Sequence, residues 1–552
     1  MKIRNLAALA FIGATFASTV LAQDDKVTTS KEFEYKAGDP YPVVDAAIKS
    51  YSSRDGGVVS FKMNSRSVTI QKFSGSPLNQ ESSKLYEDFP NGTVYEDDIE
   101  TEDFVYLLYS VWDKPNKVEQ LYVRAINLKT GEFENEGERI IAVEGKVTGG
   151  DGNKFKLATS FDNSKLLVRF RKKPESRNDK VNKDVIGLYV FDSKSMKQLW
   201  GKDVEMPYTE ARMDNIDYAV GSNGDVFILS EVMKEGETRK FDRDDNPNFD
   251  NQLIAISESG VDVNASEIDV KGKFVTQASF FEGKNDALMI AGFYGNKRGI
   301  QTDGIFYLSL TKDGTQSDFK NFEIPLELIK QYMSQRSQEK LEKKEDKGKD
   351  LGMTNMVLRD ILIHDDGSIF FAAEKYYVIT RTDTKTGNTT YDYYFEEMLA
   401  AKIDKNGELV YMKKLPKRQH SSSSGSGFGF VSFSGFIGAN FFRNSELSYK
   451  LVQSDNYYYI MFLDNVKNMM LDENKVPARH EQGRGGFLTA YQINKESGSV
   501  KKLSILDTRD AQGYELFQFS PKRIVELGDD EFAVEFYIKK KQDIMIRIKI
   551  KD

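Results

Sequence analysis

A short strand, a polar turn and a second strand recur along this chain, and this repeat constrains the fold more than any other feature. Six copies occur, at Tyr122–Phe133, Gly187–Trp200, Gln252–Val263, Ile305–Gln316, Leu399–Val410 and Leu488–Val500. Side chains alternate in character on the way into each turn, and five of the six copies carry glycine where we expect the backbone to need a positive φ. The repeat therefore predicts a succession of antiparallel hairpins.

A hydrophobic strand precedes each hairpin, and four of these strands start at a nearly constant spacing, whereas later intervals are lengthened by insertions. The steps from Phe104 to Lys165, from Lys165 to Asp225 and from Asp225 to Asp286 are 61, 60 and 61 residues. Such regularity indicates one structural unit per step. Further strands of this kind start near Val58, Ser368, Tyr457 and Glu531. The pattern predicts about eight four-stranded units and an all-β fold.

A β-propeller is the architecture that best accommodates a tandem of antiparallel sheets, because a closed ring leaves no unpaired terminal sheet. We expect eight blades, with seven as the alternative because Pro42–Phe73 is the least regular unit. The last unit has only three strands, at Arg523–Leu527, Glu531–Ile538 and Asp543–Ile550. Lys31–Lys36 is the predicted fourth strand, which would join the two ends of the chain within one blade.

Two copies of the repeat carry a recognisable motif. DSKSMKQLW at Asp192–Trp200, and more faintly NLKTGEF at Asn127–Phe133, resemble the blade motif of quinoprotein-like and WD40-like bacterial propellers. In that motif a small residue and an aspartate precede a Thr-Gly turn and a tryptophan. The resemblance implies a secreted bacterial propeller repeat. It implies no quinone cofactor, because the chain has no cysteine to supply the adjacent pair of classical quinoprotein dehydrogenases.

The N-terminus has the three parts of a secretory signal peptide. A basic start is followed by the apolar run Leu6–Leu21 and by Ala22, after which we expect cleavage. No later run is apolar for long enough to cross a bilayer, so we expect no transmembrane segment in the mature protein. The absence of cysteine despite export fits a bacterial periplasmic or cell-surface protein. It also excludes thiolate chemistry and CxxC zinc sites.

Net charge bears on the class of partner. The formal charge is -8 and the isoelectric point is near 5.4. An acidic protein lacks the positive field that phosphate backbones require, so nucleic acid is an unlikely partner.

Three insertions interrupt the repeat. Pro325–Lys349 has helical spacing at its start and a dense mixed-charge run after it, so we expect a helix docked by its first two turns. His420–Asn440 is a Gly/Ser-rich segment that contains Phe428, Phe430, Phe433 and Phe436. These phenylalanines either face a partner or fold back over the ring, and both interpretations stay open. Asn465–Gly486 is a polar loop that carries His480 and Arg484. The second and third insertions are the predicted binding loops.

No catalytic group can be assigned from a motif. His364, His420 and His480 are the only histidines, there is no GxSxG elbow, and the pair that begins at His480 lacks the second histidine of HExxH. Paired carboxylates for sugar cleavage would come from different blades, so spacing cannot reveal them.

One polar loop has oxygen ligands at alternate positions. In DRDDNPNFD, Asp242, Asp244 and Asp250 are candidate calcium ligands. Pro247 replaces the glycine that an EF-hand loop needs, so a plain turn-rich loop is the favoured interpretation and calcium the alternative. Otherwise we expect no cofactor.

These observations support three functional hypotheses. The first is an exported propeller that binds an envelope protein or glycan. The second is an extracellular glycoside hydrolase or polysaccharide lyase with carboxylates at the channel mouth. The third is a structural envelope component. The first is favoured because propellers carry function on variable loops.

Overall fold

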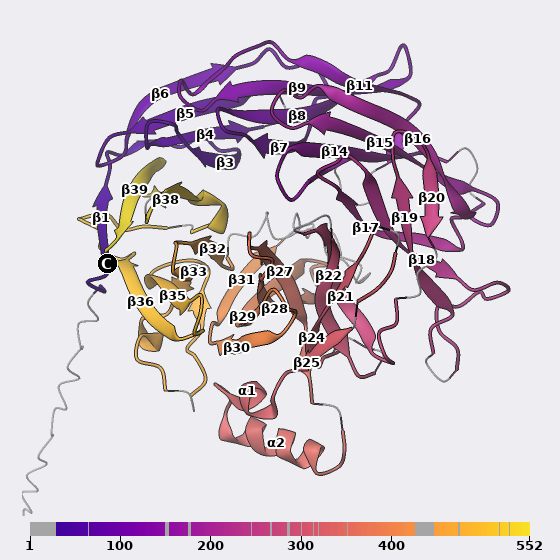
Figure 1. Cartoon of the computed structure of the whole chain (residues 1–552). Helices are drawn as coiled ribbons and strands as arrows, with labels where there is room; N and C mark the ends of the chain where they lie inside the picture. The colour runs from indigo at the N-terminus through magenta and orange to yellow at the C-terminus, as the bar shows by residue number, and fades with distance from the viewer. Residues whose placement is uncertain are drawn as a thin grey trace, which may run out of the picture.

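The computed structural model describes residues 29–551 except for positions 65, 149–153, 175–177, 244–245, 265–267, 284–286, 298, 300, 313, 318, 350, 425–446, 473–474, 518 and 529. Within these described residues, eight sheets of four to six strands and one two-stranded pair account for the named strands. Figure 1 shows the larger sheets arranged around a ring, in chain order. The fold is a β-propeller, as the repeat predicts.

The first four sheets are built from the following strands. The first contains β3 (Ala47–Ser52), β4 (Val58–Met63), β5 (Val68–Ser74) and β6 (Asn79–Tyr86). The second contains β7 (Val94–Glu100), β8 (Phe104–Asp113), β9 (Val118–Asn127), β10 (Glu132–Phe133) and β11 (Glu138–Glu144). The third contains β12 (Val147–Thr148), β13 (Phe155–Thr159), β14 (Lys165–Lys172), β15 (Lys183–Asp192) and β16 (Gln198–Thr209). The fourth contains β17 (Met213–Val220), β18 (Val226–Met233), β19 (Phe249–Ile256) and β20 (Val261–Asn264).

The second half of the chain repeats the arrangement with additions. The fifth sheet contains β21 (Phe274–Glu282), β22 (Leu288–Gly295), β24 (Gly304–Leu310) and β25 (Lys320–Glu323). The two-stranded pair beside it is β23 (Gln301–Thr302) with β26 (Met353–Thr354). The sixth sheet contains β27 (Met356–Ile363), β28 (Ile369–Thr382), β29 (Thr389–Ile403), β30 (Leu409–Leu415), β31 (Gln419–Ser424) and β34 (His480–Glu481). The seventh contains β32 (Lys450–Gln453), β33 (Tyr457–Asp464), β35 (Phe487–Asn494) and β36 (Val500–Asp507).

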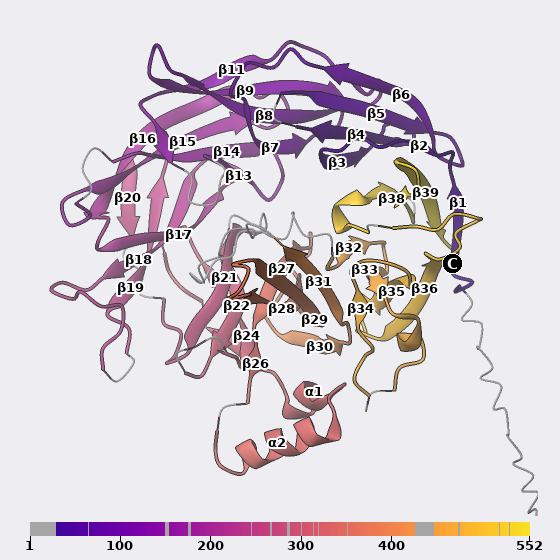
Figure 2. The same cartoon turned by 180° about the vertical axis from the view of Figure 1, so that it is seen from behind.

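The last sheet joins the two ends of the chain. It contains β37 (Ile524–Gly528), β38 (Glu531–Ile538) and β39 (Gln542–Ile550), together with β1 (Phe33–Ala37) and β2 (Tyr41–Pro42) from the N-terminal side. β1 pairs with β39 in antiparallel register, from Phe33 opposite Ile550 to Ala37 opposite Ile546. The predicted closure by an N-terminal strand is thus confirmed, and Figure 2 shows β1 beside β39.

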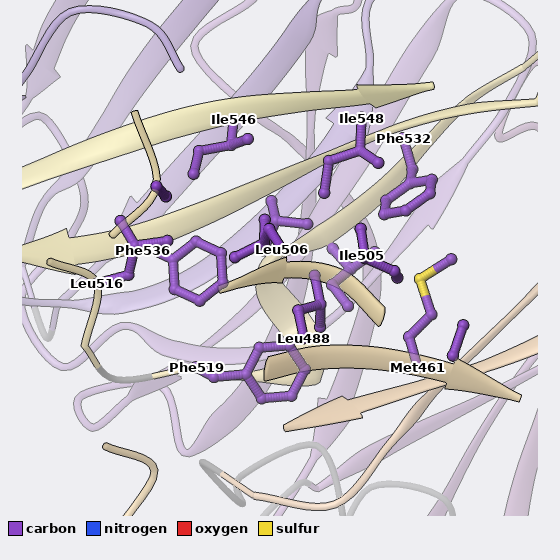
Figure 3. Close-up of a cluster of buried hydrophobic side chains, with 14 of the residues drawn as sticks. Met461, Leu488, Ile505, Leu506, Leu516, Phe519, Phe532, Phe536, Ile546 and Ile548 are labelled. Carbon is purple, nitrogen blue, oxygen red and sulfur yellow. The ribbon is translucent and has the colours of Figure 1, made fainter. Parts of the chain in front are cut away.

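Hydrophobic clusters fill the spaces between neighbouring sheets. One lies between the seventh and last sheets and includes Met461, Leu488 and Ile505 on one side and Phe532 and Ile546 on the other (Figure 3). Corresponding clusters join each other pair of neighbouring sheets, including the last sheet to the first. Burying each large apolar side chain contributes about 1.5 to 3 kcal/mol. Sheet-to-sheet packing around the whole ring therefore stabilises the fold.

Trp200 of the resembled blade motif is part of this packing. Its side chain is 8% exposed, and its Nε1 donates a hydrogen bond of 3.0 Å to the carbonyl oxygen of Gly224 in the next sheet. A buried indole N–H needs such a partner. The motif therefore has a structural role, which is to connect two adjacent sheets.

Connections within each sheet alternate between its two ends, because neighbouring strands are antiparallel. The first-to-second and third-to-fourth turns lie at one end, which we call the turn end. The second-to-third loops and the connections to the next sheet lie at the other, which we call the loop end. The first and third predicted insertions begin at the loop end, since they follow β25 and β33, and the described start of the second begins there too, since it follows β30. Sequence position alone had not indicated that they share an end.

The first insertion differs from its prediction. It contains two helices, α1 (Leu326–Lys330) and α2 (Gln335–Glu345), and not one. Tyr332 between them has a φ of 59°, which a continuous helix cannot accommodate. α1 buries Ile329 against the ring, whereas α2 has no buried residue. Docking by the first turns and solvation of the remainder are as expected.

Candidate functional site

An extended hairpin projects from the sixth sheet at the loop end. β28 and β29 are 14 and 15 residues long, and their pairing continues to Thr382 opposite Thr389. Their neighbour β27 stops pairing at Met356, opposite Lys375. The segment of β28 after Tyr376 therefore continues beyond the edge of its own blade, and Val378 and Ile379 on it are 39% and 40% exposed.

The two predicted binding loops meet beside this hairpin. The start of the Gly/Ser/Phe segment forms β31, which pairs with β29 from Gln419 opposite Phe395 to Ser424 opposite Thr390. The second loop contributes β34, which pairs with β31 in parallel, with His420 opposite Glu481. The two predicted binding loops are separated in sequence by β32 and β33 of the seventh sheet, and backbone pairing joins them here. We call the extended hairpin with β31 and β34 the platform.

His420 lies between two carboxylates on the platform. Its Nδ1 is 2.6 Å from the Glu481 Oε2 and its Nε2 is 3.1 Å from the Asp392 Oδ1. Both ring nitrogens therefore face carboxylate oxygens. Burial raises the pKa of Asp392, but the hydrogen bond from His420 and the positive charge of Arg381 outweigh it and hold this pKa below its usual value. His420 therefore holds together the hairpin and both loops.

Aromatic rings continue from this histidine along the hairpin. Tyr394 packs against His420 with ring centroids 4.8 Å apart and stacks on Tyr377 at 4.7 Å. The guanidinium of Arg479 lies 5.3 Å from the Tyr394 ring centroid. Rigid aromatic groups beside charged ones are characteristic of binding surfaces.

A buried charge cluster fixes the base of the platform. The Lys417 Nζ lies 2.5 Å from the Glu374 Oε1, and both side chains are 0% exposed. The Arg359 Nη1 and the Ser448 hydroxyl approach the other Glu374 oxygen at 3.1 and 2.5 Å. Burial lowers the pKa of Lys417. Gln419 completes the cluster by accepting hydrogen bonds of 3.0 Å from the Lys417 Nζ and from the Ser448 backbone N–H. β31 is therefore tied to the core of its blade.

The two predicted binding residues of the third insertion differ in solvent exposure. His480 is 3% exposed, desolvation lowers its pKa, and its Nε2 has no hydrogen-bond partner among the described residues. Arg484 is exposed and forms an isolated β-bridge with Phe517. His480 packs the inside of the loop, whereas His420, to which the sequence assigned no role, holds the platform together. The sequence around Asp392 and around Glu481 contains no pattern that would predict their contact with His420.

Other predicted site residues are placed as follows. Phe428, Phe430, Phe433 and Phe436 lie outside the described residues, and so does Asp244. The Asp242 carboxylate accepts hydrogen bonds from the Asn246 backbone N–H at 2.8 Å and from its side chain at 2.9 Å. Asp250 lies 3.7 Å from the Lys234 Nζ. Within the described residues, no three His, Asp or Glu side chains form a group that could hold a metal ion.

A cavity of about 640 Å³ lies at the opposite, turn end, where the sixth, seventh and last sheets meet. His364 and Lys495 line one part of it, and Glu526, Asp530 and Glu531 line another. Desolvation raises the pKa of Glu526, whereas burial and two nearby lysines lower the pKa of His364. These residues come from turns and strand ends of three sheets, so sequence spacing could not have grouped them.

No helix in the described part of the chain has the length and apolar character needed to cross a membrane.

Comparisons with known proteins show no family for this chain. No family model matches it, and no curated protein matches it. Similar solved structures include prolyl oligopeptidase B from Galerina marginata, with a TM-score of 0.37, 9% identity, and coverage of 94% of this chain and 55% of that one. The β-propeller domain of the Trilobed protease from Pyrococcus furiosus has a TM-score of 0.30 and 9% identity, with coverage of 69% and 95%. An uncharacterized protein from Listeria monocytogenes has a TM-score of 0.34 and 8% identity, with coverage of 79% and 88%. The assignment to the β-propeller fold rests on the sheets of the chain itself, and no function follows from these likenesses.

Proposed function

We propose that this chain is an exported bacterial β-propeller that acts as a protein-interaction module in the cell envelope, with the platform as its contact surface. The observation that carries the proposal is the parallel pairing of β31 with β34, which joins two long insertions to a hairpin that leaves its blade. The signal-like N-terminus and the absence of cysteine support a location in the periplasm or at the cell surface.

The edge of the extended hairpin offers backbone groups to a partner. Among the described residues, no backbone hydrogen bond reaches Tyr377–Thr382 from the side opposite β29. Unpaired strand edges accept an added strand from another polypeptide, and exposed side chains such as Val378 and Ile379 then contribute contact area. Arg381, 3.1 Å from the Asp392 carboxylate, is the only charged residue of this stretch. The buried cluster at the base keeps the edge in place, so little ordering is required on binding.

Site-specific crosslinking tests this function. A photoreactive benzoylphenylalanine in place of Ile379 should give a crosslinked protein adduct in intact cells, whereas the same group in place of Val181, which is 65% exposed, should not. The partner identified from the adduct should then bind the wild-type chain and the Val181→Asp variant equally, and the Ile379→Asp variant at least tenfold more weakly. Adducts of the same protein from both positions would contradict a contact at the platform.

A second candidate function, cleavage of a polysaccharide, is favoured by the turn-end cavity. Desolvation raises the pKa of Glu526, which is the direction that a general acid needs, and Asp530 and Glu531 lie in the same cavity. The measurement is reducing-end release from a panel of polysaccharides. Turnover by the wild-type chain that is lost in Glu526→Gln and kept in the control Glu496→Gln would establish the enzyme. Turnover that survives in Glu526→Gln would exclude this site.

A further inference from the structure

A partly buried arginine with no ion-pair partner among the described residues lies between the third and fourth sheets. The guanidinium carbon of Arg169, on β14, lies 3.9 Å from the ring centroid of Tyr218, on β17. Tyr218 is 7% exposed, and burial raises its pKa to about 12. The two strands are neighbours in the ring (Figures 1 and 2). The tyrosine ring holds the guanidinium flat and leaves its in-plane N–H groups available.

Several neighbouring charges at this location have ion-pair partners, whereas Arg169 has none among the described residues. Arg171, two residues further along β14, lies 2.6 Å from the Asp184 carboxylate and 3.3 Å from that of Glu210. Asp214 lies 2.7 Å from the Lys240 Nζ. No carboxylate lies within ion-pair distance of the Arg169 guanidinium among the described residues. The nearby carboxylate of Asp217 accepts hydrogen bonds from the backbone N–H groups of Tyr218 and Phe280. Burial raises the pKa of Asp217, and these hydrogen bonds and the charge of Arg169 oppose that increase.

A cavity of about 430 Å³ adjoins this arginine. It falls within the size range of small-molecule sites. Oxygen acceptors on its wall belong to Asp179, Asp184, Glu210 and Asn215, and the buried side chains of Ile186 and Met213 contribute an apolar part. The cavity thus combines a guanidinium that has no ion-pair partner among the described residues with several hydrogen-bond acceptors and a small apolar surface.

We propose that this cavity binds a uronic acid, a sugar whose ring carries a carboxylate. The planar guanidinium of Arg169 matches a carboxylate with two parallel hydrogen bonds. The acidic side chains accept hydrogen bonds from sugar hydroxyls, since an ionised carboxylate still has acceptor sites after pairing with an arginine. The C–H face of the sugar packs on Ile186 and Met213.

The surrounding charge selects among anions. A phosphate carries more negative charge than a carboxylate, and four acidic side chains line the cavity. The repulsion therefore falls more heavily on phosphate. A neutral sugar would leave the N–H groups of Arg169 without a charged acceptor. It would therefore lose the free energy of the hydrogen bonds between the guanidinium and a carboxylate. The site is separate from the platform and requires no catalytic step.

Calorimetric titration of the purified chain tests the proposal. Glucuronate and galacturonate should bind, with glucose and inorganic phosphate at least tenfold weaker. A parallel titration with uronate-containing oligosaccharides distinguishes two sources of the ligand. Tighter binding of the oligosaccharides than of the free sugar acids would indicate that the site holds a uronate residue of a polymer. Equal binding of glucose or phosphate, or no binding of any uronate at millimolar concentration, would overturn the proposal.

Two variants connect the binding to the geometry. Arg169→Lys keeps the charge but loses the planar pair of donors, so uronate affinity should fall at least tenfold while glucose binding stays unchanged. Arg139→Lys, at an exposed position on β11, is the matched control and should bind as the wild-type chain does. Circular dichroism and the unfolding temperature verify that both variants fold. Undiminished uronate binding by a folded Arg169→Lys variant would show that the site is elsewhere.

Discussion

Lys62 and Glu535 form a buried ion pair that joins the first sheet to the last. The Lys62 Nζ lies 2.6 Å from the Glu535 Oε1, and each side chain is 1% exposed. Asp543 lies 3.2 Å from the same Nζ, and the Tyr41 hydroxyl donates a hydrogen bond of 2.8 Å to Glu535. The contact therefore connects β4 with β38 and β39 where the ring closes, and reinforces the pairing of β1 with β39.

Replacing Lys62 should destabilise the ring strongly. Lys62→Met leaves Glu535 and Asp543 without their closest cation, and removal of one partner of a buried pair costs about 3 to 5 kcal/mol. Urea unfolding provides the measurement. The control is Lys84→Met, which removes a solvent-exposed pair with Glu132 and should therefore cost far less stability than Lys62→Met. Equal losses in the two variants would mean that the closure does not depend on Lys62.

The same cluster predicts a pH dependence. Burial, together with the charge of Glu535, raises the pKa of Asp543 to about 6. The folded chain therefore binds this proton more tightly than the unfolded chain, and the contribution of Asp543 to stability falls as pH rises from about 4 to about 6.

Asp543→Asn removes that proton equilibrium. Relative to this variant, the wild-type chain should be less stable at pH 7.5 than at pH 4.5 by about 2 kcal/mol. Urea unfolding of both proteins at both pH values gives the difference, with all other titrating groups common to the two chains. A gap between the two proteins that does not change with pH would contradict the raised pKa.

Removing Lys417 should destabilise the sixth sheet, because Glu374 would stay buried without its closest cation. Lys417→Met should lower the free energy of unfolding by about 3 to 5 kcal/mol. Adding Glu374→Gln should recover part of that loss, since the uncompensated charge is then absent. Urea unfolding of the two single variants and the double variant gives the interaction energy. Additive losses would show that the pair is not coupled.

Loss of His420 should loosen the platform without unfolding the ring. His420→Ala leaves the carboxylates of Asp392 and Glu481 without the imidazole that separates them, so backbone amides of Gln419–Ser424 should exchange hydrogen faster. The global free energy of unfolding should change by no more than about 1.5 kcal/mol, in the range of a single hydrogen-bonding group. Hydrogen exchange with mass spectrometry checks this, with the amides of β33 as the internal reference. Unchanged exchange in β31 would contradict the role of His420.

Export should remove the first 22 residues. Expression of the whole chain in a bacterial host should give a mature protein that begins at Gln23, because Ala22 ends the small-residue site after the apolar run. Intact mass and N-terminal sequencing of the secreted or periplasmic fraction measure this. Ala22→Leu should slow the processing, whereas a chain that keeps its first residues in every fraction would contradict the signal peptide.

Elements with a local cause could be read from the sequence. Alternating side chains and glycine turns specify hairpins such as Gln252–Val263, because strand faces and turn geometry depend on residues near each other in the chain. The missing strand of the last unit pointed to Lys31–Lys36, and the structure has β1 at Phe33–Ala37. The break between α1 and α2 at Tyr332 was not predicted, because helical spacing alone does not reveal a residue with positive φ.

The candidate sites depended on contacts between distant residues. His420 meets Asp392 and Glu481 across 28 and 61 residues, and Arg169 stacks on Tyr218 from a different sheet. Neither contact could be predicted from a sequence period, because each joins residues on strands that only the tertiary structure brings together. The sequence by itself determined the repeating hairpins and the closure of the chain, because these follow from local alternation and strand number. Only the tertiary structure decided which polar side chains meet at the loop end, because ring packing brings separate blades together.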